Sequence, residues 1–303
     1  MSQGLIVVTG ATGNIGSELT RLLLLKGRKV RAIGRNAEKL KALALKGAET
    51  RAADLEDRAA TVRAFAGASA AFAMIPPRND ALDFRAYQNK VSDNLAEAVK
   101  SAGVTHVVQL SSVGANLESG AGPVTGLHDS EKRFDALSAS VVHLRPAYFM
   151  ENHLNSVELI KHRGINGSGL RGDVRIPMIA TRDIAAAAAE LLAAATFTGK
   201  TTRELLGPRD YSMIEATRIL GKAVGKEDLP YVQFSYSDVE KALTGMGFTP
   251  DMARLYVEMS EAFNSGRIRP TEPREKNNTT PTTLEQFVPA FAAAYSQGVL
   301  AGV

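Results

Sequence analysis

The chain has 303 residues, of which 45% are hydrophobic and 22% charged, and its formal net charge is +4. It contains no cysteine, which excludes a disulfide framework, a thiolate metal site and a catalytic thiol. No apolar run approaches the roughly 20 residues that span a bilayer, and no basic segment leads into an apolar stretch, so we expect a cytoplasmic protein without a signal peptide or a membrane partner. The mild basic excess suits an anionic cofactor and does not by itself indicate direct nucleic-acid binding.

Apolar segments of two kinds alternate along the first half of the chain. Short runs rich in β-branched residues predict strands, and longer amphipathic runs predict helices. We expect strands at residues 5–8, 29–33, 49–53, 68–75, 104–110 and 140–144, helices at 17–25, 37–46, 57–66, 80–102 and 127–138, and a glycine-rich loop at 116–126. Six strands that alternate with helices predict an α/β fold with a doubly wound parallel sheet and right-handed crossovers.

The pattern changes after residue 150, which predicts a first domain over residues 1–150 and a smaller C-terminal α+β lobe over 151–303. In the second half we expect a helix ending near 162, helices at 184–195, 211–224, 237–246, 251–265 and 283–295, and strands at 203–207 and 231–234. Residues 164–177 could contain a hairpin, and residues 181–183 are expected to cap the alanine-rich helix. We expect the segment of about 178–207 to return and pack on the first domain.

The first predicted strand leads directly into a glycine-rich turn and a helix. The turn has the spacing G-x-x-G-x-x-G, with glycines at 10, 13 and 16. Gly10 permits a sharp turn, Gly13 lets backbone N–H groups approach a pyrophosphate, and Gly16 lets the helix pack on its strand. The alternative is an ordinary tight turn between a strand and a helix. In a dinucleotide site the remaining candidate contacts from this turn are Thr12, Asn14 and Ile15.

The ends of the next strands indicate which dinucleotide binds. Arg35 follows the second strand, where an arginine can pair with a 2′-phosphate and an acidic residue would bind a ribose hydroxyl. We therefore expect NADP(H) to be preferred, with NAD(H) as the alternative ligand, and Lys39, one helical turn further on, could assist Arg35. A solvated loop arginine is the alternative interpretation. Asp54 could accept a hydrogen bond from an adenine amino group or cap a helix. The further candidate cofactor contacts are Leu55, Met74 and Ile75.

Polar and aromatic residues follow the fifth and sixth predicted strands. Ser111 and Ser112 lie at the carboxyl end of the fifth strand, the edge at which ligands bind in this architecture, although they could simply cap the strand. After the sixth strand, Pro146, Tyr148 and Phe149 are candidate cofactor contacts, and Tyr148, Phe149 and Asn152 are candidate substrate contacts. Aromatic side chains at these positions could equally belong to the core. We expect no metal site, since His153 and His162 lack carboxylate companions at ligand spacing.

Several of these motifs together resemble the NmrA-like group of atypical short-chain dehydrogenases/reductases. They are the glycine turn of residues 9–16, Arg35, Asp54–Leu55 and residues 144–152. The resemblance implies a Rossmann domain that binds NADP(H) and a small substrate lobe. Members of the group include NAD(P)H-dependent quinone, azo and dye reductases as well as non-catalytic redox-sensing regulators.

The resemblance also exposes a departure. Extended members of the superfamily carry Y-x-x-x-K, followed by a Glu and, fourteen residues later, by Arg–Pro. Glu131 stands fourteen residues before Arg145 and therefore corresponds to the Glu of this pattern. The lysine position is then occupied by His128 and the tyrosine position by Val124, while Lys132 does not fall on the lysine position. The tyrosine that protonates the substrate oxygen is thus missing. His128 could bond the nicotinamide ribose or relay a proton, and Ser112 is the second candidate catalytic residue; a His without a role at the start of a helix is the alternative.

Two functions are consistent with these features. The first is an NADP(H)-dependent oxidoreductase that passes a hydride to a small conjugated or aromatic electrophile such as a quinone, an azo compound or a cationic dye, whose reduced form needs less help from an acid. The second is a non-catalytic redox sensor that acts through a regulatory protein partner. An epimerase is disfavoured because Val124 cannot supply acid–base chemistry. The protein is expected to be a monomer or a homodimer.

Overall fold

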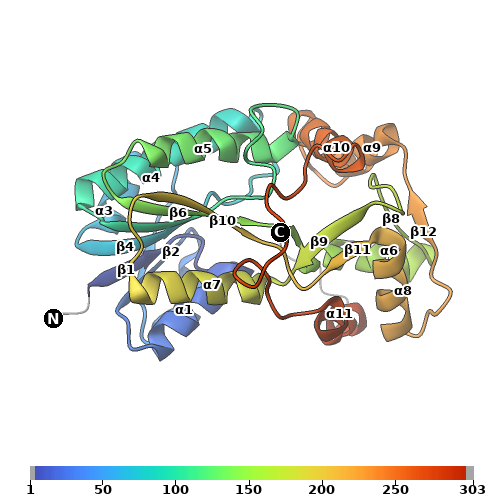
Figure 1. The fold of residues 1–303 in the computed structure, drawn as a ribbon, viewed down its shortest axis with the longest axis horizontal. Helices are drawn as coiled ribbons and strands as arrows, with labels where there is room; N and C mark the ends of the chain where they lie inside the picture. Colours follow the sequence, from blue (N-terminus) through green and yellow to red (C-terminus); the bar gives the residue numbers. More distant parts are fainter. Residues whose placement is uncertain (1–3, 298–303) are drawn as a thin grey trace.

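A seven-stranded parallel sheet forms the centre of the computed structural model, which describes residues 4–297 (Figure 1). Its strands, in spatial order, are β10 (Lys200–Leu205), β6 (Ser140–Pro146), β5 (His106–Leu110), β4 (Ala68–Ala73), β1 (Leu5–Val8), β2 (Val30–Gly34) and β3 (Glu49–Ala52). The predicted doubly wound α/β class is therefore confirmed. The seventh strand, β10, comes from the second half of the chain and pairs in parallel with β6.

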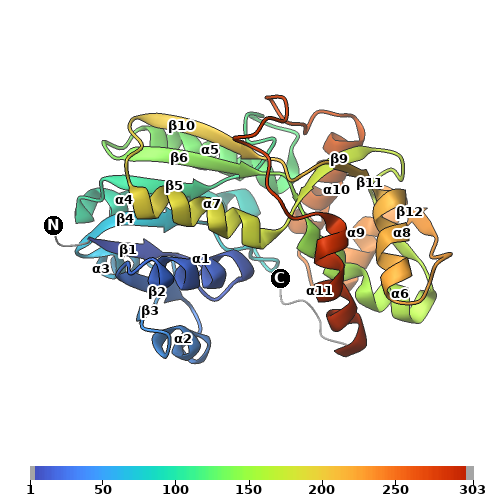
Figure 2. The same ribbon diagram turned by 60° about the horizontal axis from the view of Figure 1, so that its bottom comes forward.

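Helices cover both faces of this sheet, as Figures 1 and 2 show. One face carries α1 (Asn14–Leu25), α2 (Ala37–Ala44) and α7 (Thr181–Ala194), and the other carries α3 (Arg58–Phe65), α4 (Phe84–Ala102) and α5 (Thr125–Asp135). Alternation along β1 produces the two layers, because Ile6 and Val8 belong to the core under α1 and α7, whereas Val7 belongs to the core under α3 and α4.

The alanine-rich helix α7 packs lengthwise on α1. Its small side chains, such as Ala185 and Ala188, are fully buried, and this small size allows the two helices to approach closely. On the outer side Glu190 pairs with Lys26 of α1 at 2.7 Å. Within the described residues, no helix combines the length and the apolar character that crossing a membrane requires.

The second half of the chain builds two small sheets and a separate core. One sheet has the order β11 (Asp210–Ser212), β9 (Arg175–Ile179), β7 (Tyr148–Phe149), and the other pairs β12 (Tyr231–Gln233) with β8 (Asn166–Ser168). The helices are η2 (Met150–Ser156), α6 (Val157–Arg163), α8 (Met213–Ala223), α9 (Tyr236–Gly245), α10 (Pro250–Asn264) and α11 (Leu284–Gln297). Buried side chains of this core include Met178, Tyr211, Leu220 and Phe291.

The hairpin suggested for residues 164–177 does not form. Strand β8 pairs with β12 in parallel, and β9 pairs with β11 in antiparallel fashion. The glycines of this segment allow close packing instead of a tight turn: a Cβ at Gly167 would lie 2.6 Å from the carbonyl oxygen of Val232, and one at Gly172 would lie 2.9 Å from Ile214. The expected loop at 116–126 is also shorter than predicted, because η1 (Gly122–Val124) and the first turn of α5 lie within it.

The cap suggested for α7 at residues 181–183 is wrong as well. The N-cap is Ala180, and the helix has no cap side chain from its own sequence. Instead the carboxylate of Glu151 accepts hydrogen bonds from the backbone N–H of Thr181 at 3.0 Å and from its hydroxyl at 2.6 Å. Asp183 is inside the helix and accepts from the N–H of Thr282 at 2.9 Å, which fixes the segment that leads into α11.

The contact between α1 and the glycine turn leads to a stability prediction. A Cβ at Gly16 would lie 2.2 Å from the carbonyl oxygen of Gly10, which is rigid backbone. We therefore expect Gly16→Ala to lower the free energy of unfolding by about 2–3 kcal/mol in urea titrations, because the overpacked turn must move. Gly245→Ala is the control: nothing lies within 4 Å of that helical position, and the change should be neutral or stabilising. Equal effects of the two substitutions would contradict the close contact.

Candidate functional site

The carboxyl ends of the parallel strands meet at one edge of the sheet, and the sequence-predicted residues lie along it. The strand order reverses between β1 and β4, and ligands bind in the crevice at such a point. The turn after β1 lies in this crevice: a Cβ at Gly10 would lie 2.2 Å from the sulfur of Met74, which follows β4. The backbone at Gly10 has a φ of +61°, a conformation that favours glycine.

The start of α1 has the properties of an anion site. Its N-cap is Gly13, no side chain caps it, and its first turn contains no acidic residue, whereas Asn36, Asp57 and Asp83 cap the next three helices. Gly13 and Asn14 are exposed. Free N–H groups at a helix N-terminus bind phosphate groups, so the turn fits the pyrophosphate of a dinucleotide. The side chain of Ile15 is in the core, which leaves only its backbone to face a ligand.

Residues beyond β2 provide positive charge at the outer end of the crevice. Arg35 and Lys39 are both exposed there. Thr12 of the glycine turn is held against the end of β2, because a Cβ at Gly34 would lie 3.2 Å from the methyl carbon of Thr12. The end of β2 and the glycine turn are thus adjacent, as a dinucleotide site requires.

The structure excludes one of the two alternatives for Asp54, the helix cap. It is not a helix cap, because Asp57 caps α3 by accepting from the N–H of Ala60 at 2.9 Å. Asp54 instead accepts from the N–H of Glu56 at 3.0 Å and closes a local turn. The neighbouring Leu55 is buried, so its side chain belongs to the core rather than to an open surface.

Ser111 takes part in a buried network at the end of β5 and β6. Its hydroxyl donates to Glu131 at 2.5 Å, and Arg145 donates two hydrogen bonds to the same carboxylate at 2.9 and 2.6 Å. Burial alone would lower the pKa of Arg145, but the Glu131 carboxylate raises it above its ordinary value. The Ser111 proton is thus engaged in fixing the strand ends. The half-buried Ser112 donates to the carbonyl of Val113 at 3.0 Å.

His128 lies on the first turns of α5 with one ring nitrogen fixed. Its Nδ1 is 2.8 Å from the carbonyl oxygen of Ala115, so this nitrogen carries a proton and donates it. The other nitrogen, Nε2, is buried, has no hydrogen-bond partner among the described residues and lies 3.9 Å from Glu118. Val124 is buried in the core, and Lys132 reaches out to Glu118 at 3.4 Å. Among Val124, His128 and Lys132, only His128 therefore has a buried polar atom without a hydrogen-bond partner in the described part of the chain.

Aromatic residues from both halves of the chain meet beyond Pro146. The ring of Tyr148 lies 5.8 Å from that of His153 and 6.4 Å, edge to face, from that of Phe263 on α10. Burial raises the pKa of the Tyr148 hydroxyl, while a hydrogen bond with Asn152 opposes the shift. Asn152 itself is exposed, and Phe149 packs against the core under α1 and α7. The structure thus brings Tyr148 and Asn152 together and places Phe149 partly in the core.

The part played by α10 was missed from the sequence. Tyr256 and Phe263 are seven residues apart on this helix and share one face, which is the signal that could have identified them. Their proximity to Tyr148 depends on how the second half folds back over the sheet. Figure 1 shows α10 above the carboxyl ends of the strands.

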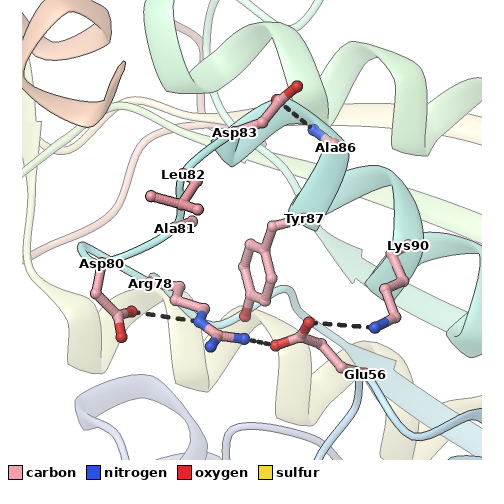
Figure 3. Close-up of a pocket in the computed structure, with 9 residues that line it drawn as sticks. All are labelled: Glu56, Arg78, Asp80, Ala81, Leu82, Asp83, Ala86, Tyr87 and Lys90. Carbon is pink, nitrogen blue, oxygen red and sulfur yellow. Dashed lines mark hydrogen bonds and ion pairs between the residues drawn. The ribbon is translucent and has the colours of Figure 1, made fainter. Parts of the chain in front are cut away.

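A pocket of about 460 Å³ lies between the loop after β4 and α4 (Figure 3). The residues that line it, among them Glu56, Arg78 and Tyr87, carry no motif in the sequence. Burial raises the pKa of Tyr87 to about 12, although the positive charges of Arg35 and Arg78 oppose this. The described part of the chain contains no group of three His, Asp or Glu residues that could hold a metal ion.

Known proteins resemble this chain over nearly its whole length. The NmrA-like family matches residues 2–288. The NAD(P)H azoreductase of Xenophilus azovorans is 29% identical over 297 residues, which cover 96% of this chain and 99% of that protein. An NADPH-dependent quinone oxidoreductase of Escherichia coli, solved with NADPH, superimposes with a TM-score of 0.73 at 26% identity, covering 94% of this chain and 99% of that one.

A further solved structure supports the fold. The triphenylmethane reductase of Citrobacter sp., solved with NADP(H), superimposes with a TM-score of 0.79 at 24% identity and covers 94% of this chain and 99% of that one. The family resemblance and the Rossmann class predicted from the sequence are therefore confirmed.

The buried histidine beside Tyr148 leads to a prediction about pH. Burial lowers the pKa of His153 to about 4. In the unfolded chain a histidine binds a proton below about pH 6.5, whereas folded His153 stays neutral until about pH 4, so acid favours unfolding in this window. We expect the free energy of unfolding to fall by about 2 kcal/mol more between pH 7 and pH 5 in the wild type than in His153→Gln.

The measurement is urea unfolding of both proteins at the two pH values. His162→Gln is the control for loss of a histidine, because the side chain of His162 is 74% exposed and lies outside the core. An identical pH dependence of the wild type and His153→Gln would contradict the buried neutral state.

Proposed function

Since the chain belongs to the NmrA-like family, we propose that it transfers a hydride from NADPH to a quinone-like or other conjugated electrophile. The protein is an NAD(P)H-dependent oxidoreductase, as its relatives are, and its cofactor is NADP(H). The observation that carries the proposal is the start of α1 at the glycine turn, which no side chain caps. In the order of the strands, Arg35 after β2 lies on one side of this turn and the aromatic residues after β6 lie on the other.

Different residues along the crevice would bind different parts of the cofactor. The N–H groups of Asn14 and Ile15 would bind the pyrophosphate, since that of Gly13 already donates to the carbonyl of Gly10. Arg35, with Lys39 one helical turn further on, would bind the 2′-phosphate. Met74 and Ile75 would line the middle of the site, and Pro146 would mark the nicotinamide end. When bound, NADPH supplies the hydride, and the chain orients it and keeps water away.

The proton chemistry favours electrophiles whose reduced form is already stabilised. A simple ketone becomes a strongly basic alkoxide and needs a positioned acid, whereas a reduced quinone spreads its charge over the ring. Val124 offers no proton. His128 donates through Nδ1 to Ala115, so its neutral ring presents an acceptor at Nε2, which suits a hydroxyl of the nicotinamide ribose. Ser112 remains a second candidate for a contact near the nicotinamide.

The substrate would lie against the residues that follow β6. Tyr148, with Phe263 beside it, offers flat apolar surface for a planar ring, and Asn152 offers a polar group at the edge. The azoreductase and the quinone oxidoreductase among the relatives act on aromatic substrates of this kind. A small conjugated or aromatic compound is therefore the proposed substrate class.

The second candidate function is a redox sensor without turnover. The observation in its favour is the buried, apolar Val124 at the position where extended relatives carry their acid. In this case the dinucleotide would bind in the same way, and the ratio of NADP+ to NADPH would control a protein partner.

Steady-state NADPH oxidation tests the choice between the two functions. With a panel of benzoquinones, naphthoquinones and azo dyes, we expect oxidation well above the rate without protein for at least one acceptor class. His128→Ala should lower the rate at saturating acceptor by about tenfold or more, because the ribose loses its partner. If the protein binds NADPH but oxidises it with no acceptor in the panel, the hydride-transfer proposal is wrong and the sensor is favoured.

Cofactor choice is tested by substituting Arg35. Arg35→Ala should weaken NADPH binding about 10- to 100-fold, the worth of a charge-assisted phosphate contact, and leave NADH binding within about twofold. Isothermal titration calorimetry with both dinucleotides measures this. Lys41→Ala, on the exposed side of α2 where it pairs with Glu38, is the matched control. A similar loss for both dinucleotides would remove the assignment of Arg35 to the 2′-phosphate.

A further inference from the structure

The pocket between the loop after β4 and α4 has no role in the function described so far. It measures about 460 Å³, and its lining includes Glu56, Arg78, Asp80, Leu82, Tyr87 and Lys90. Figure 3 shows the loop residues on one side, the face of α4 with Tyr87 and Lys90 on the other, and Glu56 at one end. None of these positions belongs to the glycine turn or to the strand ends that the sequence singled out.

Arg78 is held firmly in this pocket. Its guanidinium is ion-paired with Glu56, and its Nε lies 3.3 Å from a carboxylate oxygen of Asp80. The guanidinium carbon lies over the ring of Tyr87, 5.6 Å from the ring centroid. Lys90 approaches the other oxygen of Glu56 at 3.4 Å. The result is a planar cation fixed beside an aromatic ring, rather than a mobile surface arginine.

Four hydrogen bonds between side chains and the backbone place the pocket beside the residues that follow β3 and β4. The hydroxyl of Tyr87 donates to the carbonyl of Pro76 at 2.9 Å, directly after Met74 and Ile75. Glu56 donates its N–H to Asp54, which follows β3. Asn94 of α4 donates to the carbonyls of Leu55 and Glu56 at 2.8 and 3.0 Å, which fixes this loop against the helix. The pocket therefore adjoins the surface that carries Asp54, and the charge of Arg35 acts on Tyr87.

The charges of the pocket favour a neutral ligand. Arg78 and Lys90 are balanced by Glu56 and Asp80, and Asp83 accepts from the N–H of Ala86 to cap α4. A phosphate entering here would meet carboxylates as well as cations. A flat, neutral ring can stack on a guanidinium and a phenol, and a carboxylate can accept from its amino group. A purine base fits this description.

We propose that Arg78 and Tyr87 form the wall on which the adenine ring of the dinucleotide stacks, and that Glu56 is a positioning residue that holds Arg78 in place. This inference rests on the proposed cofactor, because the adenine is that of NADP(H). It adds residues of the neighbouring loop and helix to Asp54, which uses only its Oδ1 to close its own turn.

The test measures binding and does not depend on turnover. Arg78→Ala should weaken NADPH, NADH and adenosine 5′-diphosphate by the same factor, about tenfold, as loss of a base-stacking contact implies. Reduced nicotinamide mononucleotide, which lacks the adenine ring, should bind to Arg78→Ala as tightly as to the wild type. This pattern differs from that expected for Arg35→Ala, which discriminates between NADPH and NADH.

Further variants separate stacking from charge. Arg78→Lys keeps the charge and loses the plane, so it should not restore binding, whereas Tyr87→Phe keeps the ring and should bind within about threefold of the wild type. Glu56→Gln should weaken all three adenine probes, because Arg78 loses its charged partner. Arg58→Ala, which breaks an exposed pair with Glu97 at 3.0 Å, is the matched control for loss of an arginine–glutamate pair.

The outcomes distinguish this inference from the proposed function. Unchanged binding of adenosine 5′-diphosphate by Arg78→Ala, or full restoration by Arg78→Lys, would overturn the stacking wall while NADPH oxidation by the wild type stands. A loss confined to NADPH would make Arg78 a phosphate contact and would likewise overturn it. A wild-type protein that binds none of the adenine probes would overturn the cofactor assignment itself. Thermal unfolding of each variant shows that the change is local.

Discussion

Helix α1 approaches the turn after β1 so closely that only glycine fits at the contact. A Cβ at Gly16 would lie 2.2 Å from the carbonyl oxygen of Gly10, and Gly10 itself has a positive φ. This contact sets the direction in which α1 leaves the sheet and aims its free N–H groups into the crevice between β1 and β4. The exposed Gly13 and Asn14, the end of β2 and the end of β4 are all placed relative to this one turn.

Two carboxylates, the buried Glu204 and the half-buried Glu151, join the second half of the chain to the sheet. Glu151 accepts from Thr181 at the start of α7, and Glu204 of β10 accepts from the N–H and hydroxyl of Thr271 at 3.0 Å. Figure 2 shows the segment between α10 and α11 running past β10. Each of these two carboxylates is satisfied by N–H and O–H donors, which offset the cost of burying a charge. They hold the smaller lobe over the strand ends, where Phe263 of α10 reaches Tyr148.

The groups that fix the site and the groups left free for chemistry are different residues. The network of Ser111, Glu131 and Arg145 uses its protons to hold β5 and β6 together. His128 has one nitrogen tied to a carbonyl and the other without a partner in the described part of the chain. Val124, with its apolar side chain, stands at the position where extended relatives carry their acid. The chain therefore has groups that can orient a cofactor but no acid at this position to protonate a product.

The sequence by itself determined the alternation of strands and helices, the glycine turn and the position of Arg35, because these depend on hydrophobic period and on local backbone freedom. It also determined the family, since residues 9–16 and 144–152 are local motifs. Only the tertiary structure decided that β10 completes the sheet beside β6, that Glu151 caps α7 and that Arg78 lies between Glu56 and Tyr87. The strand pairing joins backbone segments that are far apart in the chain, and the other two contacts use side chains whose partners have no fixed spacing, so no periodicity or motif records them.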